Sequence, residues 1–154
     1  MKTERHQFLR YGLPVILWLS LIFAASTDMM SAEHTSRIIA PFLHWLVSDI
    51  APATIALVQL LVRKGAHVTE YAVLGALMAR AFRYGLKKTG THFVFLVWLL
   101  CAVWAALDEF HQTFVASRTG SPIDVMIDAA GALLGVGVYW LSSRAKAPAK
   151  SDAA

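Results

Sequence analysis

The chain has 154 residues, and 57% of them are hydrophobic, compared with about 45–50% in ordinary soluble domains. Its length fits a single domain, and its apolar residues form blocks long enough for membrane spans of about 20 residues. The formal net charge of +4 could suggest nucleic acid, but the basic residues stand between the apolar blocks, where they indicate membrane topology. We therefore expect an integral membrane protein that binds no nucleic acid.

The first apolar block, from Phe8 to Ser26, predicts the first spanning helix. Basic residues precede it and its end, Ala24-Ala25-Ser26, resembles a signal-peptidase site, so a cleaved signal peptide is the alternative. Pro41 and Pro52 then bracket residues 42–51, a stretch that is too short to span. An amphipathic stretch of this kind can lie in the membrane interface, and a plain loop is the alternative.

The second span is predicted near the middle of the chain. Residues 54–62 are apolar, Arg63-Lys64-Gly65 then breaks the apolar pattern, and residues 66–81 resume it. We expect one spanning helix that starts near Gly65 and ends at Arg83 and Tyr84. The helix that precedes it is either separate or continuous with it.

Two further spans complete the predicted domain. The third covers His92–Gln112, and the fourth runs from Pro122, which fits the first turn of a helix, to about Ser143. Residues 144–154 are rich in Ala, Lys, Ser and Pro and are expected to form a disordered cytoplasmic tail. The expected fold is all-α: a single domain of residues 1–143 with four transmembrane helices in an antiparallel bundle and an interfacial helical segment between spans one and two.

Basic residues near the ends of the blocks predict the orientation. They fall on one side of the four predicted spans: Lys2, Arg5, Arg10, Arg80, Arg83, Lys87, Lys88, Arg144, Lys146 and Lys150. The positive-inside rule makes this side the cytoplasm, so we expect both termini there, in the cytoplasmic membrane of a bacterium. The connections at residues 28–63 and 113–121 are then external.

Polar residues stand where membrane spans rarely carry them. Ionisable groups in a span are costly and usually face a bundle interior or a water-filled cavity. In the predicted topology all of these residues lie near the outer face: Lys64, His67, Glu70, Tyr71, Asp108, Glu109, His111, Gln112, Arg118, Asp124 and Asp128. Because they come from three spans and one loop, they predict one shared outward-facing site.

The spacing of the polar residues along the helices supports one shared site. Asp124 and Asp128 are one turn apart, and their stripe continues through Gly131 and Gly135. Small residues at this spacing let two membrane helices approach closely. We therefore expect the two aspartates to point toward a neighbouring helix rather than toward lipid.

The charges of the predicted site do not cancel, because its carboxylates outnumber its cations. Carboxylates removed from water must be protonated, pair with a cation or stay hydrated. They form either a structural salt-bridge network between helices or a binding or catalytic site. In a catalytic site, His67 or His111 would act as acid or base together with Asp108 or Glu109, and the candidate catalytic residues are His67, Glu70, Asp108, Glu109 and His111.

Binding roles are predicted for the other polar residues. Lys64 and Arg118 are suited to hold a phosphate or pyrophosphate, and the remaining candidates for substrate contacts are Tyr71, Gln112, Asp124 and Asp128. A divalent metal such as zinc or manganese is a further hypothesis, with its ligands drawn from His67, Glu70, Glu109 and His111 or from the two aspartates. The chain has no His-Glu-x-x-His motif that would specify such a metal.

Three stretches resemble the VanZ-like family, which is named for a teicoplanin-resistance protein of Gram-positive bacteria. They are Lys64–Tyr71 (KGAHVTEY), Asp108–Phe114 (DEFHQTF) and Arg118 with Ser121–Gly131 (SPIDVMIDAAG). The resemblance covers about residues 10–143. It implies a small bacterial membrane protein with several spans and a setting at the cell envelope that is linked to antibiotic resistance, but no particular reaction.

We therefore expect an outward-facing site that binds or modifies a lipid-linked or cell-envelope molecule. The expected partners are membrane lipids and, at the site, a glycolipid or a lipid-linked envelope precursor whose tail stays in the bilayer. One alternative is a non-enzymatic envelope accessory protein that lowers antibiotic access, and another is a small cation or proton transporter. Four spans without visible inverted repeats make the transporter the weaker alternative for a monomer.

Overall fold

The computed structural model describes residues 2–27, 32–85, 87 and 90–145, and every regular element among them is a helix. The elements are α1 (Lys2–Gln7), the π-helix η1 (Phe8–Gly12), α2 (Leu13–Ala25), α3 (Ala32–Leu46), α4 (Pro52–Tyr84), α5 (Thr91–Gln112) and α6 (Pro122–Ala145). The prediction of an all-α protein is confirmed. The expected tail lies outside the described residues from residue 146 onward, and α6 continues past Ser143 to Ala145.

Three helical segments are long and apolar enough to cross a membrane. They are Glu4–Ala25, which joins α1, η1 and α2, Thr91–Gln112 and Pro122–Arg144. These segments correspond to the first, third and fourth predicted spans. The first starts before Phe8, because α1 is already helical. In length and hydropathy, the three are typical of a membrane protein.

The second predicted span lies within α4, a 33-residue helix that runs from Pro52 to Tyr84. Arg63, Lys64 and Glu70 lie in its middle, and it is not among the three segments that reach membrane-like apolarity. The charged residues do not interrupt the helix, because Arg, Lys and Glu are good helix formers. Of the two expectations for this region, the continuous helix is the one found.

The segment between the first span and α4 contains a helix, as expected, but with different bounds. We expected an amphipathic stretch at residues 42–51, but the helix here is α3, which ends at Leu46. Pro41 lies inside α3 rather than at its boundary, because a helix can continue past a proline that removes one backbone hydrogen bond. Ile38, Phe42 and Trp45 follow at helical spacing and are 75%, 58% and 79% exposed, so α3 presents an apolar face.

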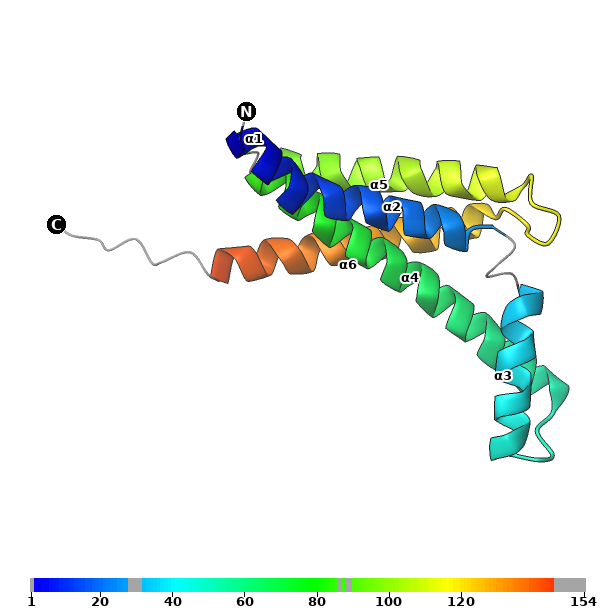
Figure 1. Cartoon of the computed structure of the whole chain (residues 1–154). Coiled ribbons are helices and arrows are strands. Elements are labelled where there is room, and N and C mark those ends of the chain that lie inside the picture. Colours follow the sequence, from blue (N-terminus) through cyan, green and yellow to red (C-terminus); the bar gives the residue numbers. More distant parts are fainter. Residues whose placement is uncertain (1, 28–31, 86, 88–89, 146–154) are drawn as a thin grey trace.

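The backbones of α4 and α6 are in direct contact where the two helices cross (Figure 1). A Cβ atom at Gly131 would lie 2.6 Å from the carbonyl oxygen of Val68, and one at Gly135 would overlap the carbonyl oxygen of Ala72. We call these four residues the glycine seam. The predicted close approach of the glycine stripe to a neighbouring helix is confirmed.

An apolar core fills the space between α2, α4, α5 and α6. Its most deeply buried side chains are Ile22, Tyr71, Leu74, Val97, Cys101, Ala132 and Val136. Cys101 is therefore a packing residue. Other large apolar side chains point outward, such as Leu17 at 61% exposure and Leu107 at 56%, which suits contact with membrane lipid.

Of the basic residues that predicted the orientation, Arg80, Arg83 and Arg144 lie at the same end of the molecule as Tyr11, whereas Lys88, Lys146 and Lys150 lie outside the described residues. Figure 1 shows the start of α1 and the end of α6 at this end, and α3 with the α5–α6 loop at the other. Here the rings of Tyr11 and Tyr84 stack with centroids 5.6 Å apart, and the guanidinium of Arg80 lies 5.3 Å from the centroid of Tyr11. Arg83 donates a hydrogen bond to the hydroxyl of Ser143 at the end of α6.

Candidate functional site

Buried polar side chains gather where α4, α5 and α6 meet beside the end of α2. Each is at most 8% exposed: Ser26, His67, Asp108, Glu109, Gln112, Asp124 and Asp128. This cluster forms because α5 ends and α6 begins at the same end of the molecule, next to the polar middle of α4 (Figure 1). Except for Ser26, all of these residues were predicted from the sequence to share one site.

Two charge pairs join α4 to α6. Lys64 forms a salt bridge with Asp124, and the Nδ1 atom of His67 lies 3.0 Å from Oδ1 of Asp128. Asp128 is fully buried, and its other oxygen has no hydrogen-bond partner among the described residues. The hydrogen-bond partner of His67 is Asp128 of α6, which the glycine seam brings against it. The pairing of His67 with Asp108 or Glu109 in acid–base chemistry stays a prediction.

The carboxylates of α5 are held by hydrogen bonds to uncharged groups. Asp108 Oδ2 accepts from the hydroxyl of Ser26 at 2.7 Å and from the amide of Gln112 at 3.1 Å. Glu109 accepts from the backbone N–H of Ser121 at 2.8 Å and from Gln112 at 3.3 Å. Gln112 therefore connects the two carboxylates, and Ser26 ties the end of α2 to them.

Arg118 closes the C-terminal end of α2. Its guanidinium donates to the carbonyl oxygens of Ala25 and Thr27, which is a favourable place for a cation because the last carbonyls of a helix have no partner within it. Burial lowers the pKa of Arg118, and the nearby Arg63 lowers it further. We predicted that Arg118 binds a phosphate, but some of its N–H groups already donate to carbonyl oxygens within the protein.

A cavity of about 110 Å³ opens beside this cluster. Its polar lining consists of Ser26, Thr35, Arg63, His67, Glu70, Gln112 and Arg118. The side chains of Arg63 and Glu70 have no hydrogen-bond partner within the described parts of the chain. We call this hollow the polar cavity. Arg63 was not among the predicted site residues, because the sequence alone does not show whether its side chain turns inward.

Two predicted site residues, as far as the structure describes the chain, neither line the polar cavity nor pair with the buried polar cluster. Tyr71 is fully buried in the apolar core, and its hydroxyl has no partner among the described residues, so it offers no surface to a ligand. The ring of His111 lies against Phe23 of α2, with centroids 4.6 Å apart, and makes no hydrogen bond to Asp108. A position on the correct helix face was therefore not sufficient to bring either residue to the cavity.

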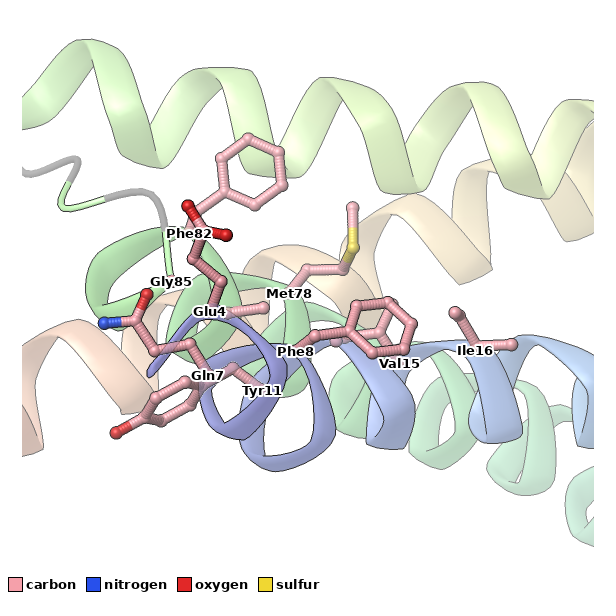
Figure 2. Close-up of a pocket in the computed structure, with 11 residues that line it drawn as sticks. Glu4, Gln7, Phe8, Tyr11, Val15, Ile16, Met78, Phe82 and Gly85 are labelled. Atoms are coloured by element: carbon pink, nitrogen blue, oxygen red, sulfur yellow. The ribbon is translucent and has the colours of Figure 1, made fainter. Parts of the chain in front are cut away.

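A larger hollow lies at the opposite end of the molecule. Figure 2 shows this pocket of about 420 Å³ between η1 and α4, with Phe8, Tyr11, Val15, Met78 and Phe82 among its lining residues. It is mostly apolar and shares no residue with the polar cavity. Despite its size, it holds none of the residues of the predicted site.

Comparison with known proteins identifies the family that carries this cluster. The VanZ/LLP1 family model matches residues 11–143, which include every polar residue described above. The chain belongs to the VanZ/LLP1 family. This confirms the resemblance seen in the sequence. No curated protein and no solved structure matches the chain.

In this VanZ/LLP1 protein the polar residues fall into two groups with different chemistry. Lys64 and His67 are paired with aspartates across the α4–α6 contact, where they hold the two helices together. Arg63 and Glu70 line the polar cavity, and neither forms a salt bridge with another residue that the structure describes. The first group suits a structural network, and the second suits recognition of a charged ligand.

Proposed function

We propose that this VanZ/LLP1 protein crosses the bacterial cytoplasmic membrane four times and uses the polar cavity to bind the anionic part of a lipid-linked cell-envelope molecule at the outer face. The observation that carries the proposal is the polar cavity itself, with two guanidinium groups, from Arg63 and Arg118, in its lining. Arginine is the residue best suited to bind phosphate oxygens in pairs.

The proposed fourth span is the C-terminal part of α4. Residues 66–81 are largely apolar, and the polar side chains of His67 and Tyr71 are turned inward rather than toward lipid. At about 1.5 Å per residue, α4 is roughly 50 Å long, which exceeds the roughly 30 Å of a hydrocarbon core. Its first turns would then project beyond the membrane with α3, on the external side.

The size and charge of the polar cavity favour a phosphate-sized group over a whole ligand. Its 110 Å³ is small beside the roughly 300–1,000 Å³ of sites that enclose drug-sized molecules. The rest of a lipid-linked molecule would therefore lie outside it, with the tail among the exposed apolar side chains of the helices. Of the predicted acid–base residues, His67 and Glu70 line the cavity and are the ones within reach of such a ligand.

Binding of a lipid pyrophosphate tests the proposal. The full chain, purified in mild detergent, is titrated with a polyprenyl pyrophosphate and with the matching polyprenyl alcohol, and bound lipid is counted by native mass spectrometry. We expect the pyrophosphate to bind more tightly than the alcohol. Arg63→Gln should weaken pyrophosphate binding roughly tenfold or more, because a hydrogen bond to a charged group contributes about 1.5–3 kcal/mol.

Arg10→Gln is the matched control, because Arg10 is an exposed arginine near the opposite end of the molecule. It removes the same charge without touching the polar cavity. Equal binding of the alcohol and the pyrophosphate, or an equal loss of affinity in both arginine variants, would contradict the proposed site.

A further inference from the structure

Three ligand-type side chains from three different helices meet beside the polar cavity. A ring nitrogen of His67 on α4, a carboxylate oxygen of Glu109 on α5 and one of Asp124 on α6 all lie within 4.8 Å of one another. All three side chains are buried. Imidazole and carboxylate groups at this separation match the donors that zinc and manganese take in proteins.

We propose that His67, Glu109 and Asp124 bind one divalent transition-metal ion. This set differs from the metal ligands considered from the sequence, because Glu70 and His111 are not part of it. The three residues would leave one coordination position open on a tetrahedral ion, as in zinc sites that accept a water or a substrate oxygen.

The surroundings of the three ligands are those of a metal site. Metal-binding histidines commonly donate their second ring nitrogen to a carboxylate, which fixes the ring and its tautomer. Asp128, fully buried, accepts from Nδ1 of His67 in this way, so the proposed ion would be bound by Nε2. Hydrogen bonds from Ser121 and Gln112 hold the carboxylate of Glu109.

Lys64 competes with the proposed ion. Its ammonium group forms a salt bridge with Asp124, so an incoming metal must displace a bound cation from one of its ligands. This gives the proposal a distinctive consequence. Removing the ammonium should tighten metal binding, whereas removing a ligand should abolish it.

The open position of the ion would adjoin the polar cavity, because His67 belongs to both. A phosphate oxygen bound there would contact the metal and the arginines together. This link to the ligand rests on the proposed function, but the binding of the metal does not.

Metal binding to the full chain in detergent tests the proposal, with Zn²⁺ and Mn²⁺ as the probes. After chelation and removal of the chelator, we expect about one equivalent of one of these ions per chain, measured by titration calorimetry and elemental analysis. His67→Gln and Glu109→Gln should lose this binding, and Asp128→Asn should weaken it about 10–100-fold. Lys64→Met should bind more tightly than the wild type.

Glu70→Gln is the matched control, because Glu70 lines the same cavity but is not one of the three ligands, and it should keep the full metal content. Absence of binding in both the wild type and Lys64→Met would overturn the proposal, as would binding that survives in folded His67→Gln and Glu109→Gln. Lipid pyrophosphate binding that depends on Arg63 in metal-free protein would leave the proposed function standing when the metal site fails.

Discussion

Asp128 is a carboxylate held in the contact between α4 and α6. It is fully buried, has one oxygen bonded to His67 and lies one helical turn from a second aspartate that pairs with Lys64. A buried charge pair contributes little compared with a well-packed apolar pair, but removing one partner leaves the other without compensation. The pair should therefore behave as a unit, whatever its role in binding.

Replacing one member of the His67–Asp128 pair should destabilise the protein more than replacing both. Asp128→Leu alone should lower the free energy of unfolding by about 3–5 kcal/mol, because His67 loses its partner in a buried setting. The double variant His67→Leu/Asp128→Leu should recover much of this loss. Unfolding in detergent, followed by circular dichroism, measures both.

His92→Ala serves as the control, because His92 is exposed at the start of α5 and its replacement should change stability by no more than about 0.5 kcal/mol. A double variant that is less stable than either single variant would show that the two residues contribute independently.

At the scale of the elements, the contact between α4 and α6 depends on the absence of side chains. The glycine seam places backbone against backbone, and on α6 the paired residues Asp128 and Asp124 precede Gly131 by about one and two turns. Close helix approach and pairing of the buried charges therefore depend on each other. A small change in helix separation should disturb both.

Two glycines of α6 allow a matched test of this dependence. Gly135→Ala places a methyl group against the carbonyl oxygen of Ala72 and should destabilise the protein by about 1–3 kcal/mol. At Gly137 no atom lies within 4 Å of the new methyl group, so Gly137→Ala should be neutral or stabilise by up to about 1 kcal/mol through helix propensity. Melting temperatures in one detergent compare the two. Equal destabilisation by both would argue against the close contact.

At the scale of the whole molecule, the two ends differ in the charge of their side chains. The stacked tyrosines, with Arg80 and Arg83, lie near the start of α1 and the end of α6, and the buried acids lie toward the α5–α6 loop. The positive-inside rule then predicts the direction in which the protein is inserted. A cavity at the acidic end would be open to molecules of the outer leaflet.

Reporter fusions test this orientation directly. A reporter attached after Arg144 should show a cytoplasmic location, and a reporter inserted near Ser117 should show an external location. The reason is that the four-span topology places these two sites on opposite sides of the membrane. A third reporter near Ile50 should be external if α4 provides the fourth span. A cytoplasmic reading at Ile50 would leave three spans and remove the outward-facing cavity.

Much of this arrangement could be predicted from the sequence because its signals are local. Apolar blocks gave the helices, and the spacing of Asp124 and Asp128 with the glycines gave the face that meets another helix. The hydrogen bonds of Ser26 to Asp108 and of Arg118 to the last carbonyls of α2 could not be predicted in this way, because they depend on where the end of α2 lies relative to distant parts of the chain. For the same reason, the sequence could not predict that Tyr71 and His111 lie away from the polar cavity.

The glycine seam also restricts how a ligand can enter and leave. Two helices whose backbones already touch, and whose charged side chains are paired, cannot part without losing the pairs, so α4 and α6 should move as one rigid body. The polar cavity is lined by α4, and its other walls come from the end of α2, Thr35 of α3, Gln112 of α5 and Arg118 of the α5–α6 loop. Among these elements α3 stands apart from the helix bundle with its apolar face exposed, so we expect ligand exchange to be gated by a swinging motion of α3 (Figure 1). The residence time of a ligand would then depend on how firmly the surrounding lipid holds that one helix.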